Sequence, residues 1–234
     1  MGDKKISIRY YSDLLCVWAY VAEVRLEELR GSFLEQVELE QRFVPVFGNT
    51  DKKIGQGWED RGGWKAYSDH VRRAVDSFAR LPVHPEVWAT AAPPSSHGAH
   101  AFVKAAAVLE QEGEIDAARS EKLHGRTAVE ELAWRLRAAF FSDGLDIARL
   151  EVQLATAKEM DLPADRIREL LENGRAFAAL AVDYEAATRD QVKGSPTFVL
   201  NEGRQQLYGN VGYGIIEANI QELLRDRRDM ASWC

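Results

Sequence analysis

The stretch "SDLLCVWAYVAE", residues 12–23, lies where a predicted strand gives way to a predicted helix. The preceding "KKISIRYYSD" alternates apolar and polar residues, which is typical of a strand. After Cys16 the apolar residues recur at helical spacing, and Gly31 is the predicted end of the helix. A cysteine at this position meets unpaired backbone N–H groups and the positive end of the helix dipole, which favour thiolate over thiol. The alternative is a buried cysteine that serves as a small apolar filler.

Two further segments complete a sheet. The run "VELEQRFVPVF" alternates again and predicts a second strand, so residues 1–47 read as a β-α-β unit with parallel strands. Near the other end, "GSPTFVLNEGRQQLYGN" predicts a β-hairpin, and a final helix follows with Ile215, Ile216 and Ile220 in its buried stripe. The expected fold class is therefore α/β: β-α-β … β-β-α, with a four-stranded mixed sheet and helices on both faces.

The middle of the chain reads as mostly helical. Several runs show three-to-four residue apolar spacing, separated by glycines and prolines, after a proline-rich loop at residues 81–96. We expect residues 1–57 and 191–234 to form the sheet domain and residues 58–190 to form an inserted α-helical subdomain.

Composition narrows the classes of partner. The chain has 234 residues, 46% hydrophobic and 29% charged, with a net charge of −7. This charge disfavours binding to nucleic acid or to an anionic membrane, since both require a concentrated basic surface. We find neither a signal peptide nor a long apolar stretch, and the two cysteines make no disulfide framework, so the expected location is the cytoplasm.

Pro196 is the second residue of interest, because it stands directly before the predicted strand "TFVL". A proline there cannot donate a hydrogen bond to a neighbouring strand. If the Ser195–Pro196 bond is cis, the chain turns sharply and residue 195 presents its N–H and C=O groups to an extended ligand. The alternative is a trans proline that merely begins an edge strand.

The two pieces together resemble the DsbA-like branch of the thioredoxin superfamily. Its redox members carry Cys-x-x-Cys at the start of the first helix and a cis-proline facing it. Here Cys16 matches the first cysteine, Ala19 replaces the second, and Pro196 matches the proline. The motif "CVWAY" combines the cysteine of FrnE-type oxidoreductases ("CPWCY") with the "WAY" of 2-hydroxychromene-2-carboxylate isomerases and kappa-class glutathione transferases ("SPWAY").

The resemblance implies a thioredoxin-like sheet domain and an enzyme that uses one thiol. The first hypothesis is a DsbA-like thiol-disulfide oxidoreductase with Cys16 as nucleophile, while Ser195 and Pro196 hold the substrate. A second is a thiol-dependent isomerase or transferase of the kappa and hydroxychromene-carboxylate-isomerase type. A third is a non-catalytic thioredoxin-like module that binds a peptide or partner.

The family resemblance also implies which ligands to expect. We expect no tightly bound cofactor, a small thiol such as glutathione, and a thiol- or disulfide-containing substrate. Trp18 would form an apolar wall, and Asn210 belongs to a loop that helps hold the ligand in glutathione-using relatives. The histidines of "HGAH", His97 and His100, lack further ligands nearby in sequence, so no metal site is expected. The kappa-class resemblance leaves a homodimer open.

Overall fold

The computed structural model describes residues 5–76, 78 and 81–225, so Cys234 lies outside the described residues. Its centre is one sheet in the order β2-β1-β3-β4. Strand β1 is parallel to β2, and β3 is antiparallel to both β1 and β4. The predicted four-stranded mixed sheet is confirmed, with strands β1 (Ile6–Ser12), β2 (Val37–Phe43), β3 (Thr197–Leu200) and β4 (Gln205–Tyr208).

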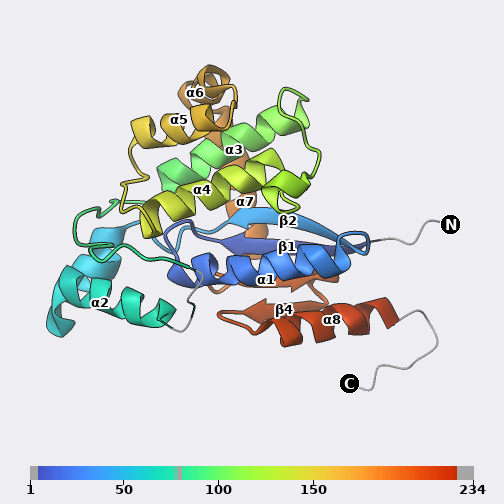
Figure 1. The fold of residues 1–234 in the computed structure, drawn as a ribbon, viewed down its shortest axis with the longest axis horizontal. Coiled ribbons are helices and arrows are strands. Elements are labelled where there is room, and N and C mark those ends of the chain that lie inside the picture. Colours follow the sequence, from blue (N-terminus) through green and yellow to red (C-terminus); the bar gives the residue numbers. More distant parts are fainter. Residues whose placement is uncertain (1–4, 77, 79–80, 226–234) are drawn as a thin grey trace.

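Helices cover both faces of this sheet (Figure 1). Helices α1 (Val17–Phe33) and α8 (Tyr213–Arg225) pack on one face, in a core cluster with Ile8 and Phe198. Helix α7 (Arg175–Arg189) packs on the other, where Ala186 shares a cluster with Val199. Because successive residues of a strand point to opposite faces, Phe198 and Val199 serve different layers.

The remaining helices lie between β2 and β3 in the chain. Most gather beside the sheet, and α2 lies next to the end at which β1 meets α1 (left in Figure 1). They are α2 (Gly63–Val75), α3 (His97–Gln111), α4 (Ala128–Phe141), α5 (Leu150–Glu159) and α6 (Ala164–Glu172), with short turns η1 (Asp51–Gln56), η2 (Glu59–Arg61) and η3 (Glu121–Leu123). A further short turn, η4 (Asn201–Gly203), joins β3 to β4.

The largest core cluster joins the start of α1 to buried side chains of α2, α3, α4 and α6. Residues of both predicted segments thus share one core. The division into a sheet domain and an inserted helical subdomain stays a prediction.

Two local expectations were wrong. Helix α1 continues through Gly31 to Phe33, because buried Leu29 and Phe33 anchor its last turns and outweigh the roughly 1 kcal/mol that a mid-helix glycine costs. Ile215 is 54% exposed rather than buried, because the core-facing positions of α8 are Ile216 and Ile220, one turn apart.

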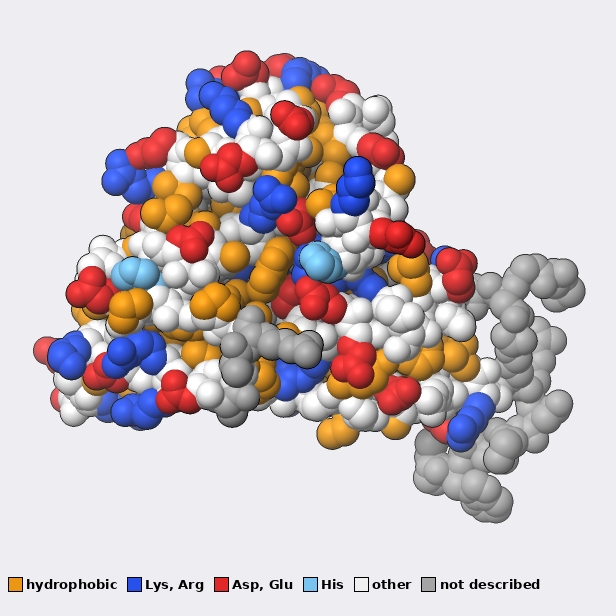
Figure 2. Space-filling model, viewed as in Figure 1, with side chains coloured by type: hydrophobic (Ala, Val, Ile, Leu, Met, Phe, Trp, Pro, Cys, Tyr) orange, Lys and Arg blue, Asp and Glu red, His pale blue; other side chains and the backbone are white. Residues whose placement is uncertain are grey.

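Among the described residues, we find no helix with the length and apolarity needed to span a membrane. On the face shown in Figure 2, basic and acidic side chains are interspersed around the apolar ones.

Candidate functional site

Cys16 is the N-cap residue of α1, directly after the loop that leaves β1. Its backbone is extended, with φ −87° and ψ 117°. The Cys16 N–H donates to the carbonyl of Asp13 at 3.1 Å, and its own carbonyl accepts from the N–H groups of Ala19 and Tyr20, both at 3.0 Å. The sulfur therefore stands where α1 begins, as the sequence predicts.

Pro196 meets Cys16 across the end of the sheet. The Ser195–Pro196 peptide bond is cis. Strand β3 follows at once and pairs with β1, with Thr197 opposite Tyr11. This pairing brings the proline loop to the end of β1, where the Cys16 sulfur lies 3.3 Å from the Ser195 carbonyl oxygen. Residues far apart in the chain thus share one site.

The thiol is not activated by its position on the helix. Cys16 is only 5% exposed. Burial raises the pKa of the Cys16 thiol above its ordinary value, and the negative charge of Asp13 adds to this. Hydrogen bonding by Ser195 and by the N–H of Ala19 opposes the rise without reversing it. The N–H groups at the helix start favour the thiolate, as expected, but the loss of solvation on burial outweighs them and raises the pKa of the thiol.

The other predicted binding residues lie around this pair. Trp18 is the second residue of α1 and is partly buried against the largest core cluster. Asn210 is exposed in the loop after β4. Its neighbour Gly209 donates its N–H to the Pro196 carbonyl at 2.9 Å, so this loop borders the proline. The structure brings Cys16 and Ser195 into contact, while roles for Trp18 and Asn210 stay predictions.

Asp13 is a site residue that reasoning from the sequence missed. It is fully buried, and its Oδ1 accepts from the N–H of Leu15 at 2.9 Å. Its Oδ2 accepts from the N–H of Phe47 at 2.7 Å and from the hydroxyl of Ser96 at 2.8 Å. The signal in the sequence was a carboxylate three residues before the cysteine, at a position where the neighbours on both sides are apolar or small.

His100 packs beside this carboxylate. The imidazole is fully buried and stacks on Phe43 with ring centroids 4.5 Å apart. Its Nε2 accepts from the N–H of Leu14 at 3.1 Å and lies 3.5 Å from Asp13 Oδ1. Burial opposes the Asp13 charge, but His100 and the N–H groups of Phe47 and Leu15 hold the pKa of Asp13 below its ordinary value. No group of three or more potential metal-ligating side chains occurs in the part of the chain that is described.

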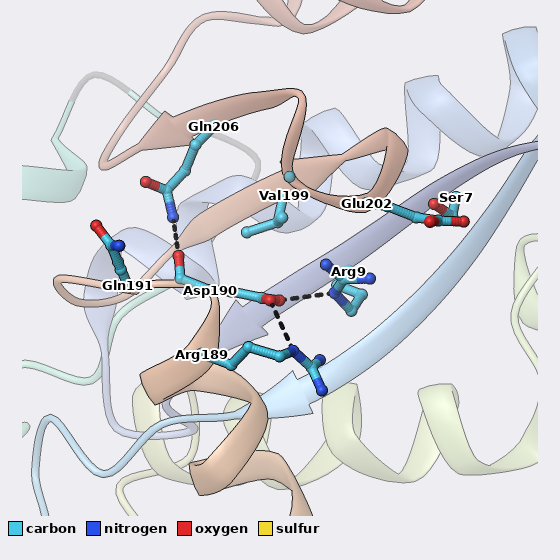
Figure 3. Close-up of a pocket in the computed structure, with 9 residues that line it drawn as sticks. Ser7, Arg9, Arg189, Asp190, Gln191, Val199, Glu202 and Gln206 are labelled. Carbon is cyan, nitrogen blue, oxygen red and sulfur yellow. Dashed lines mark hydrogen bonds and ion pairs between the residues drawn. The ribbon is translucent and has the colours of Figure 1, made fainter.

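A polar hollow of about 690 Å³ lies elsewhere, on the α7 face and towards the opposite end of β1 (Figure 3). Its central carboxylate, Asp190, already accepts from Arg9 Nε and from the Tyr11 hydroxyl, each at 2.7 Å, and pairs with Arg189 at 3.3 Å. None of the predicted site residues lines it. Its charged groups satisfy one another, so we do not place the reaction there.

Comparison with known families agrees with this geometry. Residues 7–221 match the family model of the DSBA-like thioredoxin domain. The chain belongs to the DsbA-like thioredoxin family. No curated protein matches the sequence of this DsbA-like chain.

Solved structures share the fold at low sequence identity. A probable DsbA oxidoreductase from Streptomyces coelicolor has a TM-score of 0.69 and 18% identity, covering 97% of this chain and 94% of that one. The cytosolic disulfide reductase DsbM from Pseudomonas aeruginosa has a TM-score of 0.62 and 20% identity, covering 94% and 98%. A 2-hydroxychromene-2-carboxylate isomerase has a TM-score of 0.64 and 15% identity, covering 97% and 100%.

Proposed function

We propose that this DsbA-like protein is a thiol-disulfide oxidoreductase that works with one nucleophilic cysteine, Cys16. The observation that carries the proposal is the 3.3 Å contact between the Cys16 sulfur and the Ser195 carbonyl, next to the cis bond of Pro196. Ala19 occupies the position of a second cysteine. The proposed site thus combines a nucleophile with a proline loop and has no resolving thiol at residue 19.

The proposed thiol-disulfide exchange has two steps and uses one thiol from outside the protein. The Cys16 thiolate attacks a disulfide, so that a Cys16 mixed disulfide forms and one sulfur of the substrate leaves as a thiolate, which takes up a proton. A small-molecule thiol from solution, in its thiolate form, then attacks the mixed disulfide. Cys16 leaves as a thiolate, and the product is a new external disulfide. Because residue 19 has no sulfur, our proposal assigns the second step to a thiol from solution.

A small thiol such as glutathione fits this role. The DsbM neighbour has also been solved with GSH, at 21% identity to this chain. In our proposal Ser195 and Pro196 hold the peptide part of such a thiol, with Trp18 and Asn210 at the borders of the site. A reducing compartment such as the cytoplasm would supply that thiol and keep Cys16 reduced. We leave a homodimer open.

The test is adduct formation with oxidised glutathione, measured by mass spectrometry of the intact protein and of its peptides. We expect one adduct, at Cys16, whose yield in a fixed time rises with pH because burial raises the pKa of the thiol. Cys234→Ser is the matched control, since the chain has only two cysteines and this change leaves Cys16 in place. Absence of a Cys16 adduct at every pH would contradict the proposal.

The raised thiol pKa also favours a second candidate, a thiol-dependent isomerase or transferase. A protonated Cys16 would donate a hydrogen bond to the sulfur of a bound cofactor thiol rather than attack it. The probe is 2-hydroxychromene-2-carboxylate with glutathione, assayed on the wild type and on Cys16→Ser. Activity retained by the serine variant supports this candidate, whereas the oxidoreductase requires the sulfur and would lose its activity.

A further inference from the structure

Four segments of the chain converge on Asp13. Its carboxylate accepts from Leu15 in the loop before α1, from Phe47 in the loop after β2, and from Ser96 at the N-cap of α3. Its backbone N–H donates to the Ser195 hydroxyl at 2.9 Å, and its carbonyl accepts from the N–H of Cys16 at 3.1 Å. One residue therefore ties the cysteine loop to the proline loop.

The partners of this carboxylate are neutral donors and one imidazole. The Leu14 N–H donates to His100 Nε2 at 3.1 Å, and the same nitrogen lies 3.5 Å from Asp13 Oδ1. His100 Nδ1 is buried and has no hydrogen-bond partner. The Asp13 charge is thus held in place without a fixed cation among the described hydrogen-bond partners.

We propose that Asp13, backed by His100, is the positioning residue of the Cys16 site: it holds the sulfur against Ser195 and acts on the thiol through a carboxylate whose described hydrogen-bond partners include no arginine or lysine. The carboxylate touches neither substrate nor the reacting sulfur, so its role is exerted through Cys16. The assignment of a site rests on the proposed function, but the ionisation of the thiol can be measured whatever reaction the protein catalyses.

The charge acts in a defined direction. An ionised Asp13 disfavours a second negative charge on Cys16, and so adds to the larger effect of burial, which raises the pKa of the thiol. The other titratable groups whose charges reach this pair come from α2, α3, α7 and β1. They are Tyr67, His97, His100, Tyr184 and Tyr10.

The first experiment compares Asp13→Asn with Ser96→Ala. In each folded variant the pH dependence of iodoacetamide alkylation at Cys16 gives the thiol pKa. We expect Asp13→Asn to lower this pKa by about one unit, which raises the thiolate fraction at pH 7 about tenfold. Ser96→Ala removes one bond from the same carboxylate but keeps its charge, so the thiol pKa should stay near the wild-type value.

Two results would overturn the proposal. One is a Cys16 pKa that is unchanged or higher in folded Asp13→Asn. The other is an equal fall in both variants, which would show that loosening of the loop, rather than loss of charge, releases the thiol.

A second measurement uses the unaltered site, in case Asp13→Asn does not fold. The ¹³C chemical shift of the Asp13 carboxyl carbon is followed from pH 7 upward in the wild type. We expect an inflection at the pH at which Cys16 ionises, because the two charges sense one another. The Cys16→Ser variant should lack this inflection. A wild-type titration without it, over a range in which alkylation shows that Cys16 ionises, would reject the proposal.

Discussion

Two carboxylates are buried near the start of α1, Asp13 before it and Glu23 within it, and their partners differ in charge. Glu23 is 3% exposed and accepts from two guanidinium groups, Arg30 and Arg126, each at 3.0 Å. Asp13 is fully buried and accepts from two backbone N–H groups and one hydroxyl, with His100 beside it. One charge is matched by fixed cations, and the other is not.

The difference separates a structural charge from one that acts on the thiol. Burial opposes the Glu23 charge, but its two arginines hold the pKa of Glu23 below its ordinary value, and they compensate its field locally. The field of Asp13 instead raises the pKa of Cys16, after the larger effect of burial. Removing a cation that pairs with Glu23 should therefore lower stability, whereas removing the charge of Asp13 should alter the ionisation of the thiol.

The largest effect is expected on the compensated side, from Arg126→Ala. Arg126 is 1% exposed and also pairs with Glu131 at 3.1 Å and Glu27 at 2.6 Å. Its loss removes one of the two arginines that pair with each of the buried carboxylates Glu23 and Glu131, which costs roughly 3–5 kcal/mol of the free energy of unfolding. Urea denaturation measures this loss, and the Cys16 pKa should remain at its wild-type value in the folded variant.

The matched control is Arg135→Ala. Arg135 pairs with Glu131 at 2.8 Å but is 39% exposed, so its loss should cost under about 1 kcal/mol. Equal destabilisation by the two changes would contradict the distinction between the buried cluster and the surface pair. A large change in Cys16 reactivity in folded Arg126→Ala would show that the compensated cluster also acts on the thiol.

The sequence predicted the sheet and the approach of the Ser195–Pro196 loop to Cys16, because both depend on local patterns and on topology. Alternating runs identify strands, and strand order brings the ends of β1 and β3 together. It did not predict the ionisation of the thiol, which depends on how much solvent the surrounding helices exclude. The position of a cysteine at a predicted helix start does not show how deeply its thiol is buried.

The hydrogen-bond partners of Asp13 could not be predicted from the sequence either. Phe47 lies in a loop after β2, and Ser96 lies in the segment before α3. Neither spacing nor composition relates these residues to position 13. His97 and His100 illustrate the same limit, because one-turn spacing showed that they share a helix but not that only His100 is fully buried beside a carboxylate.

The next effect is expected on the uncompensated side, from Ser195→Ala. The change removes the acceptor for the buried Asp13 N–H, which costs roughly 1–2 kcal/mol of stability. It also removes hydrogen bonding that favours the Cys16 thiolate, so the thiol pKa should rise further, opposite to the effect of Asp13→Asn. Iodoacetamide alkylation at a fixed pH near 8 should therefore be slower than in the wild type.

Thr197→Val is the control for this loop. The Thr197 hydroxyl donates to the Gly194 carbonyl at 2.8 Å. This bond lies in the same loop as Ser195 but does not involve the Ser195 side chain or the Cys16 sulfur. Its loss should lower stability without slowing alkylation. Slower alkylation in both variants would indicate a general displacement of the proline loop rather than a specific effect of Ser195 on the thiol.

The smallest effect concerns stability at alkaline pH and distinguishes the two carboxylates from the thiol. Asp13 and Glu23 have folded pKa values below their ordinary ones, so both contribute stability above about pH 4 that is lost as pH falls through the folded pKa values. Cys16 has a folded pKa above its ordinary value, so its contribution is present below about pH 8.5 and is lost as pH rises through the folded pKa.

The part of the alkaline loss that depends on Cys16 should appear as the difference between the wild type and Cys16→Ser. The tyrosines whose pKa burial raises also contribute as pH approaches their unfolded pKa of about 10, but they contribute equally in both proteins. One ionising thiol changes the free energy of unfolding by at most about 1.4 kcal/mol per pH unit. Cys16→Ser should flatten the stability profile above about pH 8.5 and leave the acid limb unchanged, as measured by urea denaturation at each pH. A profile in the serine variant that falls as steeply as the wild type would mean that the thiol gains no proton affinity on folding, and burial of Cys16 would then lose its place as the main control on the site.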